Sequence, residues 1–441
     1  MTSTAIRNAR LVNEGRITEG DLLIRDGRIE AIGTVGAADA EFDAAGRLLL
    51  PGMIDDQVHF REPGMEYKGE IKTESAAAVA GGITSYMEMP NCNPLSINQE
   101  RIDAKRARAA EVSAANYAFY LGATNDNLES IKAIDPLTVC GVKVFMGAST
   151  GNMLVDNEQT LEGIFSSTPL LIATHCEDTP MILANEAAWA ERFGADIPAT
   201  EHPNIRSTEA CWKSSSLAVG LAKKHDARLH VLHLTTAKEM ALFEPGPIAG
   251  KRITAEACVH HLFFDETWYA AKGNDIKCNP AIKKPSDREA VMAALLEDRI
   301  DVVATDHAPH TREEKDRPYP QAPAGLPLVQ HALLTMFEHV HAGRMSIEKV
   351  VEKVCHAPAE IFAVRERGYL REGYWADLVC VDDGALTVVD DEPVYYKCGW
   401  SPFAGITFHS RVAATWVNGE LRYDGKEVLP GACGVALEFA R

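Results

Sequence analysis

The chain has 441 residues, of which 46% are hydrophobic and 24% charged, and these are ordinary values for a globular protein. Its formal net charge of −19, with no compensating run of Lys and Arg, disfavours nucleic acid and anionic membrane surfaces as partners. A small anionic substrate held by local cations is compatible with this charge. The length fits one large domain of about 250–350 residues and a smaller one.

The ten cysteines are scattered and form no Cys-x-x-Cys pair, so thiolate zinc sites and redox pairs are not expected. The N-terminus lacks the apolar core of a signal peptide, and no apolar run is long enough to span a bilayer. We therefore expect a soluble cytoplasmic protein. A homodimer is the expected assembly, because it is the commonest one among soluble proteins.

The first segment, residues 1–52, is predicted to form short strands. Their boundaries are marked by turn residues such as Asp26-Gly27 and Ala45-Gly46, and the strands are expected at 5–12, 21–24, 28–32 and 47–50. This segment has too little apolar content to form a core alone, so it must pair with another part of the chain.

Strand-like and helix-like runs alternate through residues 53–365. Strands are expected near 53–59, 84–89, 117–122, 139–146, 170–175, 228–233, 252–256 and 301–305, with helices at 70–80, 99–111, 210–224, 286–297 and 328–342. Eight such units predict a (β/α)8 barrel. An open doubly wound sheet is the alternative, but no Gly-rich dinucleotide loop follows the first strand.

The last segment, residues 366–441, is again strand-like. Strands are expected at 368–370, 376–381, 411–417 and 420–423, and the last two are joined by Asn418-Gly419, which is a hairpin signal. We expect the two terminal segments to pair into one small β-sandwich beside the barrel.

Polar residues recur where the barrel strands end, which is where such barrels place their active sites. Gln57, His59 and Arg61 alternate, so they share one face of the first strand. The other strand ends carry Asn91, Lys143, His175, His233, Glu256, Asn279, Asp306 and His310. Each histidine alone could be a hydrogen-bonded core residue. As a set, imidazoles and a carboxylate at equivalent strand ends predict a metal site, with zinc the best match.

Lys143 lies inside an apolar strand, where an unpaired ammonium is costly. A neutral amine could add carbon dioxide and become a carbamate that bridges two metals. Pairing with a buried acid is the alternative, and both interpretations stay open. Glu256, His260 and His261 are expected to be structural or to support ligands, and His230 is assigned to packing.

The motifs together resemble those of the cyclic amidohydrolases, and among them the dihydroorotases, over nearly the whole chain. They are residues 55–64, Met89-Pro90-Asn91, Lys143 in its strand, Thr174-His175-Cys176-Glu177, His233, Asn279-Pro280, residues 304–310 and the late segment 398–405.

The resemblance implies a reversible ring opening of dihydroorotate by water to N-carbamoyl-L-aspartate, in de novo pyrimidine synthesis. It implies that His59 binds one metal, that His175 and His233 bind the other, and that carboxylated Lys143 bridges them. Asp306 would bind metal and act as general acid and base. The substrate would be held by Arg61, Asn91 and His310 at its carboxylate and by Asn279 at its pyrimidine edge.

Three departures from the family pattern qualify this expectation. Gln57 replaces the first histidine of a His-x-His pair, and a carboxamide binds zinc weakly compared with imidazole. We therefore expect one firm metal at His175, His233 and Lys143 and a weaker or absent one near His59. Ala324 replaces an aromatic residue, and Lys283 stands where the family has arginine.

Two other functions are considered. A non-catalytic scaffold that supports aspartate transcarbamoylase would explain Gln57, but it would have no physical reason to keep the remaining ligands. An allantoinase or hydantoinase would share the barrel, metals and lysine without needing the carboxylate-binding residues. The segment 147–152, which follows the Lys143 strand, is a candidate lid.

Overall fold

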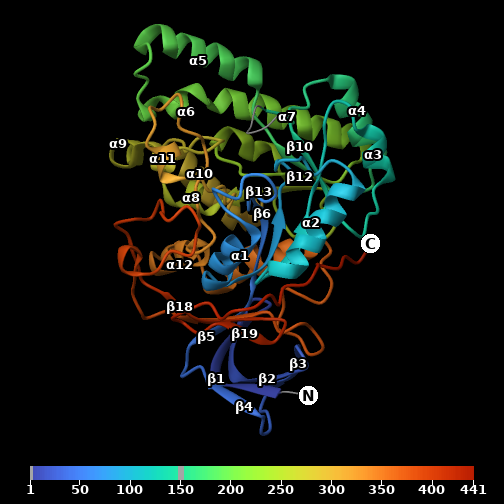
Figure 1. Cartoon of the computed structure of the whole chain (residues 1–441), viewed down its shortest axis with the longest axis vertical. Coiled ribbons are helices and arrows are strands. Elements are labelled where there is room, and N and C mark those ends of the chain that lie inside the picture. The colour runs from blue at the N-terminus through green and yellow to red at the C-terminus, as the bar shows by residue number, and fades with distance from the viewer. Residues whose placement is uncertain (1–2, 148–152) are drawn as a thin grey trace.

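The computed structural model describes residues 3–147 and 153–441. Figure 1 shows helices packed around a central set of strands, with a separate sheet built from both chain ends below them. Of the candidate lid, residues 148–152 lie outside the described residues.

The central strands are parallel and form a ring. They pair as β6-β7-β8 and as β14-β13-β12-β11-β10-β9, and Tyr120 alone separates β8 from β9. The ring closes where Val58 bridges His307 and the His59 N–H donates to the His307 carbonyl at 2.7 Å. The strands are β6 (Met53–Val58), β7 (Ile83–Glu88), β8 (Asn116–Phe119), β9 (Leu121–Gly122), β10 (Val142–Phe145), β11 (Ile172–His175), β12 (Leu229–Val231), β13 (Ile253–Cys258) and β14 (Val302–Ala304).

This ring has the TIM-barrel arrangement that the alternating pattern predicted. Each predicted strand is found within a few residues, because the strands are buried on both faces and appear in the sequence as apolar runs. Their carboxyl ends therefore lie at one end of the barrel, and they bring the polar residues that follow them together.

Helices surround the barrel and connect its strands (Figure 1). Side chains of Asn98, Asp178 and Ser207 cap α2, α5 and α7 by accepting hydrogen bonds from their first turns. The α-helices are α1 (Ile71–Ala80), α2 (Gln99–Val112), α3 (Leu128–Ala133), α4 (Glu158–Ser167), α5 (Thr179–Phe193), α6 (His202–Ile205), α7 (Thr208–His225), α8 (Val259–Phe263), α9 (Tyr269–Lys272), α10 (Pro285–Leu296), α11 (Arg312–Lys315), α12 (Ala332–His341), α13 (Ile347–Val351) and α14 (Ala357–Ile361).

The five predicted helices are present, with ends shifted by a few residues. The long helix α5 was not predicted. Its fully buried side chain is Ile182, while Met181, Trp189 and Phe193 pack in part against the same small cluster, so the helix has an apolar face that the prediction missed.

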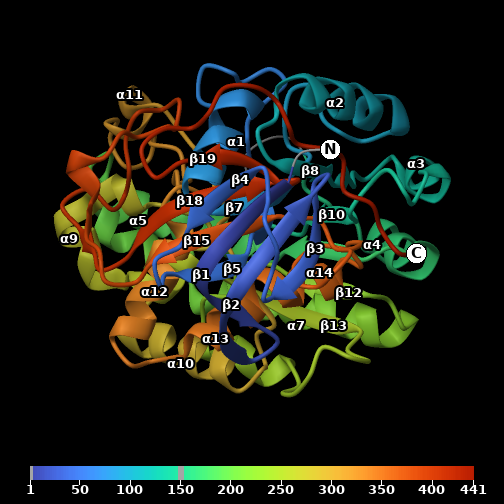
Figure 2. The same cartoon turned by 90° about the horizontal axis from the view of Figure 1, so that it is seen from below.

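Both chain ends contribute to one eight-stranded sheet, ordered β19-β18-β15-β5-β1-β2-β3, with β4 paired to β1. The N-terminal and C-terminal parts join where β5 pairs antiparallel with β15, and Figure 2 shows these strands together in front of the barrel. Its members are β1 (Ser3–Asn13), β2 (Arg16–Arg25), β3 (Arg28–Gly33), β4 (Ala40–Asp43), β5 (Leu48–Pro51), β15 (Leu378–Asp382), β18 (Arg411–Val417) and β19 (Glu420–Tyr423).

The joining of the two termini agrees with the prediction, whereas a division into two sandwich layers and the domain boundaries stay predictions. A further pair, β16 (Thr387–Val388) with β17 (Thr407–Phe408), forms a small separate sheet. The predicted strand at 368–370 is wrong, because Gly368 has a φ of +79°, outside the extended range of a strand. The Asn418-Gly419 hairpin is confirmed, with positive φ at both residues.

The barrel and the terminal sheet are linked by the buried carboxylate of Asp377. It forms an ion pair with Arg367 and accepts hydrogen bonds from the Asn116 side chain at 3.1 Å and from the Asn418 backbone at 2.8 Å. Asn116 belongs to β8 and Asn418 to the β18–β19 turn, so one side chain connects both parts of the fold. Within the described residues, no helix is long and apolar enough to cross a membrane.

Candidate active site

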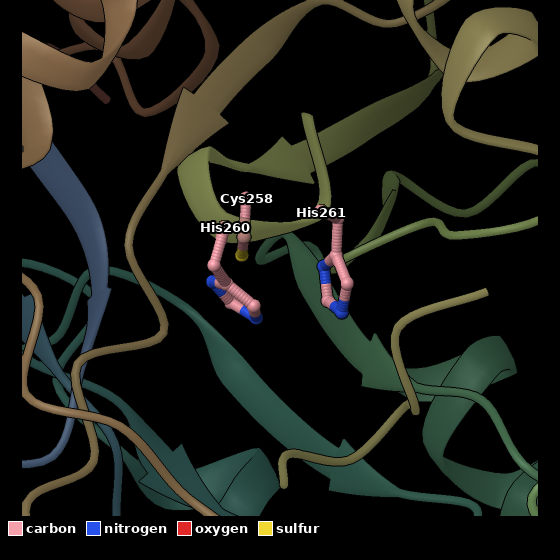
Figure 3. Close-up of side chains that lie close together, drawn as sticks. All are labelled: Cys258, His260 and His261. Carbon is pink, nitrogen blue, oxygen red and sulfur yellow. The ribbon is translucent and has the colours of Figure 1, made fainter. Parts of the chain in front are cut away.

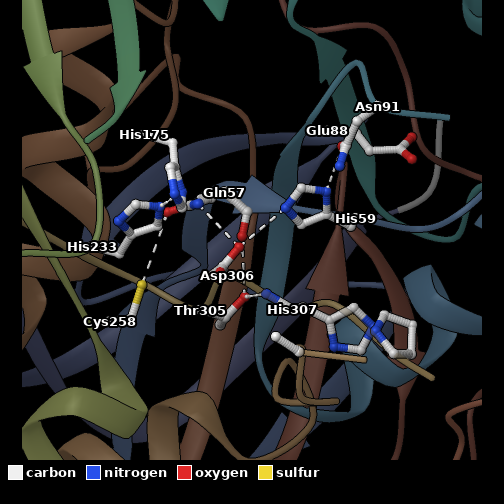
Figure 4. A network of polar contacts seen from close by, with 12 residues as sticks. Gln57, His59, Glu88, Asn91, His175, His233, Cys258, Thr305, Asp306 and His307 are labelled. Atoms are coloured by element: carbon white, nitrogen blue, oxygen red, sulfur yellow. Dashed lines mark hydrogen bonds and ion pairs between the residues drawn. The ribbon is translucent and has the colours of Figure 1, made fainter. Parts of the chain in front are cut away.

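A pocket opens at the carboxyl ends of the barrel strands. Nine of the predicted polar residues line it together, although they come from distant parts of the chain. Its walls are formed by Gln57, His59, Arg61, Asn91, Lys143, Phe145, His175, His233, Asn279, Asp306, Ala308, Ala324 and Gly325. Figure 4 shows several of these side chains converging on Asp306.

His175 and His233 face each other across one side of the pocket. Nε2 of His175 lies 3.0 Å from the Glu177 carboxylate, so its proton belongs there and Nδ1 keeps its lone pair. That Nδ1 lies 3.0 Å from Nε2 of His233. Arg206 donates to the same Glu177 carboxylate at 2.6 Å and fixes it in place. This geometry suits two imidazoles that bind one ion, with a carboxylate orienting one of them.

His59 and Asp306 face each other on the opposite side. Nδ1–H of His59 donates to the Asn91 side-chain oxygen at 2.7 Å, which leaves the lone pair on Nε2. This Nε2 lies 3.1 Å from Oδ1 of Asp306, and Gln57 donates to the same oxygen at 3.0 Å. A spacing of 3.1 Å fits two ligand atoms that share one zinc ion, each about 2.0–2.2 Å from it.

Lys143 is buried in the pocket wall on β10. Burial lowers the pKa of its amine to about 8, even though the nearby carboxylates of Asp306 and Glu256 act in the opposite direction. The Phe145 ring lies 4.6 Å from Nζ. The lowered pKa increases the neutral fraction of the amine near neutral pH, and the neutral amine is the form that can add carbon dioxide.

Three pocket residues adopt backbone conformations that favour glycine. The φ angles are +69° at Arg61, +39° at His233 and +51° at Asp306. Non-glycine residues in this region cost free energy, and such strain is concentrated at functional sites. The fold therefore holds these side chains in place against their local preference.

His310 lies behind the pocket wall and does not line it. Nε2 lies 3.1 Å from the Ala324 carbonyl, to which only a protonated nitrogen can donate, and Nδ1 accepts from Lys68 at 3.0 Å. Nε2 is also 3.1 Å from Arg61, but this is then a contact between two nitrogens that both carry hydrogen. The role of His310 in binding a substrate carboxylate stays a prediction, because Nε2 would have to leave Ala324.

Asn279 lines the pocket, which is compatible with its predicted role beside a substrate ring. Among the described residues, its Oδ1 is buried without a hydrogen-bond partner. An N–H group of a ligand would satisfy this oxygen. Lys283, which stands where arginine was expected, donates to the Ala281 carbonyl at 2.9 Å and does not line the pocket.

His230 was assigned to packing, but it belongs to a buried charged group beside the site. Its Nε2 lies 3.2 Å from Asp56 and 3.7 Å from Glu256. Burial alone would lower the pKa of His230, but the two carboxylates raise it to about 9. Glu256 also accepts a hydrogen bond from the His233 backbone at 2.8 Å, which agrees with the expected supporting role.

The sequence did not single out Arg206 or Cys258. Glu177 stood in a quoted motif, and its position two residues after His175 was the available signal. Arg206 gave no signal, because it reaches the site only through the packing of α6 and α7. Cys258 follows Glu256 by two residues and so shares its strand face, where its Sγ lies 3.9 Å from Oε1 of Gln57.

Comparisons with known proteins place this chain in a family. The sequence model described as "Dihydro-orotase-like" matches residues 46–195, and the "Amidohydrolase family" model matches residues 213–422. A dihydroorotase from Listeria welshimeri is 33% identical over 430 residues, which cover 95% of this chain and 98% of that protein. The chain belongs to the dihydroorotase-like amidohydrolases. A dihydroorotase from Halobacterium salinarum is 32% identical over 428 residues, which are 96% of this chain and 97% of that protein.

Solved structures of other family members have the same fold. L-hydantoinase (dihydropyrimidinase) from Arthrobacter aurescens has a TM-score of 0.93 and 26% identity, and it covers 99% of this chain and 100% of its own. Dihydropyrimidinase from Brevibacillus agri has a TM-score of 0.89 and 23% identity, with 100% of both chains covered, and it shows the fold alone. The protein is therefore a cyclic amidohydrolase, and its substrate has to be argued from the pocket.

Proposed function

We propose that this protein is a dihydroorotase, which interconverts dihydroorotate and N-carbamoyl-L-aspartate. The observation that carries the proposal is the Arg61 guanidinium in the same pocket as the histidines, Lys143 and Asp306. A guanidinium matches the planar carboxylate of dihydroorotate, and a hydantoin or dihydropyrimidine ring has no such group to neutralise it. The full-length similarity to dihydroorotases supports the same substrate.

The donor atoms fit a metal-dependent hydrolase with zinc as its metal. His175 and His233 would hold one ion, His59 and Asp306 the other, and Lys143 as a carbamate would bridge them. When bound, the metal acidifies a water molecule and polarises the ring carbonyl. Gln57 adds no imidazole to the His59 side, so we propose that the ion at His175 and His233 is held more firmly.

The side chains would have separate roles in substrate binding and proton transfer. Arg61 and Asn91 hold the substrate carboxylate, and Asn279 Oδ1 accepts a hydrogen bond from the ring. This orientation places the scissile amide beside Asp306. Asp306 takes the proton of the attacking water and delivers it to the amide nitrogen as the C–N bond breaks. The ammonium form of Lys143 is disfavoured by its burial, and carboxylation would turn it into an anion.

Parallel assays of the purified, zinc-loaded protein test the proposal. Dihydroorotate, carbamoyl aspartate, hydantoin, dihydrouracil and allantoin are supplied separately at the same enzyme concentration. We expect turnover of the first two with much higher kcat/KM than of any ring without a carboxylate. Preference for hydantoin or dihydrouracil would support the hydantoinase alternative, which the fold similarity favours.

The scaffold alternative is tested by metal content. A protein that only supports aspartate transcarbamoylase would have no reason to bind zinc, so failure to retain any metal, together with no turnover, would favour it. The cytoplasmic location and the homodimer remain part of the proposal, and size-exclusion chromatography with light scattering tests the dimer.

A further inference from the structure

A second group of potential ligands lies beside the pocket. Cys258 ends β13, and His260 and His261 follow it in α8 (Figure 3). One ligand atom from each of the three side chains lies within 4.8 Å of the others, and all three residues are buried. The proposed catalytic ligands include none of them.

The protonation state of His261 leaves a lone pair for a metal. Its Nε2 lies 3.0 Å from the Pro280 carbonyl, which can only accept, so the proton belongs on Nε2. Burial lowers the pKa of His261 to about 4, so the ring is neutral at physiological pH. Nδ1 is then an acceptor, and in the described part of the chain it has no hydrogen-bond partner. Histidines that bind metals are typically held by such a bond to the opposite nitrogen.

His260 is unusual because both of its ring nitrogens are buried without a hydrogen-bond partner among the described residues. Its pKa is lowered well below the usual value, mainly by burial and then by His261, while a hydrogen-bond-like contact with the Thr305 backbone raises it. This contact can satisfy one ring nitrogen at most, so the other stays without a partner in the portion of the chain that the structure describes. The two ring centroids are only 4.0 Å apart. A buried imidazole without partners costs free energy, and a bound cation would remove that cost.

Acidic side chains lie close to the Cys258 thiol. The pKa of the Cys258 thiol is raised well above its usual value, first by burial and then by the carboxylates of Glu256, Asp306 and Asp55. Sγ lies 3.5 Å from Glu256. Burial raises the pKa of Glu256 to about 8 and that of Asp55 to about 7. A divalent cation would neutralise the thiolate it binds and would favour the charged form of these two acids.

We propose that Cys258, His260 and His261 form a binding site for a thiophilic divalent cation, with zinc as the best match. One thiolate and two imidazoles are ligands that zinc prefers, and three protein ligands leave a fourth position open. On binding, the Cys258 thiol releases its proton to solvent, and both imidazoles bind in their neutral form. Gln57 Oε1 is a candidate for the fourth position, since it lies 3.9 Å from Sγ.

This site would explain why the protein tolerates an amide at position 57. Gln57 connects the two groups, because its Nε2 donates to Asp306 while its Oε1 faces Cys258. The spacing of the cysteines along the sequence did not predict a thiolate site. The ligands follow each other within four residues, and only the turn from β13 into α8 brings their side chains together.

Cobalt titration of the full-length apoprotein tests the proposal independently of any activity. A thiolate bound to Co²⁺ gives a charge-transfer absorption in the near ultraviolet, which nitrogen and oxygen ligands do not give. We expect this absorption in the wild-type protein and its loss in Cys258→Ser, with one fewer Co²⁺ bound per chain. Cys355→Ser is the matched control, because it also removes a buried thiol, and it should keep both signals.

X-ray absorption of the wild-type zinc-loaded protein provides a test without any substitution. We expect one sulfur scatterer per chain at about 2.3 Å from zinc. His260→Asn and His261→Asn should each lower the binding affinity for the zinc ion that gives this sulfur signal by at least tenfold. Absence of sulfur around zinc, or a cobalt band that persists in Cys258→Ser, would overturn the site.

Discussion

Oδ1 of Asp306 meets two nitrogens at hydrogen-bonding distance, one from Gln57 and one from His59. The contact with Gln57 is an ordinary hydrogen bond, because the amide N–H donates to Oδ1. The second brings a lone pair of His59 toward a carboxylate, because the His59 proton is used by Asn91. With this tautomer the contact is unfavourable by itself, and the proposed cation between the two side chains would relieve it.

Asp306→Asn should lower kcat for dihydroorotate by about 10²–10⁴-fold, because the amide cannot take up the proton. The substitution preserves size, so thermal unfolding measured by circular dichroism should change little. Steady-state kinetics in both reaction directions gives the measurement. Activity within tenfold of wild type would show that another group moves the proton.

Arg61→Met should weaken the binding of dihydroorotate by about 1.5–3 kcal/mol, which is the range for hydrogen bonds to charged groups. Dihydrouracil, which lacks the carboxylate, is the matched control substrate. Its kcat/KM should be almost unchanged by the substitution. Equal losses for both substrates would mean that Arg61 does not bind the carboxylate.

Gln57→His should increase the zinc content or tighten its weaker site, because imidazole is a better zinc ligand than a carboxamide. Metal analysis after dialysis against a weak chelator measures this change. If metal content and activity both match the wild type, Gln57 is a neighbour of the site and does not limit it.

At the scale of elements, the end of β11 is held by the segment between α6 and α7. Arg206 leaves this segment to reach Glu177, and Glu177 in turn orients His175. Burial would raise the pKa of Glu177, but Arg206 and then His175 lower it to about 2. The carboxylate therefore stays charged, and a helical insertion fixes the direction of a metal ligand.

Arg206→Met should lower zinc affinity roughly 10–100-fold, which is typical when a group that orients a ligand is lost. Competition with a chromophoric chelator measures the dissociation constant. Arg192→Met is the control, since Arg192 lies in the neighbouring helix α5 and stacks on Phe193 away from the pocket. Equal effects of the two substitutions would contradict the link through Glu177.

At the scale of the whole molecule, the terminal sheet is attached to the barrel through Asp377, Asn116 and Asn418. Arg367 and Asp377 form a buried ion pair at this junction. Removing one member of such a pair leaves the other charge buried and uncompensated. The two parts of the fold should therefore unfold together.

Asp377→Asn should lower the free energy of unfolding by about 3–5 kcal/mol, measured by urea denaturation. Asp383→Asn is the control, because it breaks the more exposed pair with Arg10 in the same sheet and should cost less than about 1 kcal/mol. Similar costs for the two variants would show that the junction is not a buried electrostatic link.

Much of the fold could be predicted because its signals are local. The barrel strands are apolar runs, the β18–β19 turn is Asn-Gly, and the strand ends carry His59, Lys143 and Asp306. Helix α5 was missed because its apolar face, formed by Ile182, Trp189 and Phe193, is mostly only half-buried and packs on a small separate cluster. Gly368 broke a predicted strand through its backbone conformation.

The sequence by itself determined which residue types reach the barrel mouth, because parallel strands end on one side. Only the tertiary structure decided how these side chains meet. It set the hydrogen-bond partners of the ring nitrogens of His59 and His175, placed His310 beside Arg61, and brought Arg206 to Glu177. Such contacts join residues up to 249 positions apart, and their geometry depends on packing that no local pattern encodes.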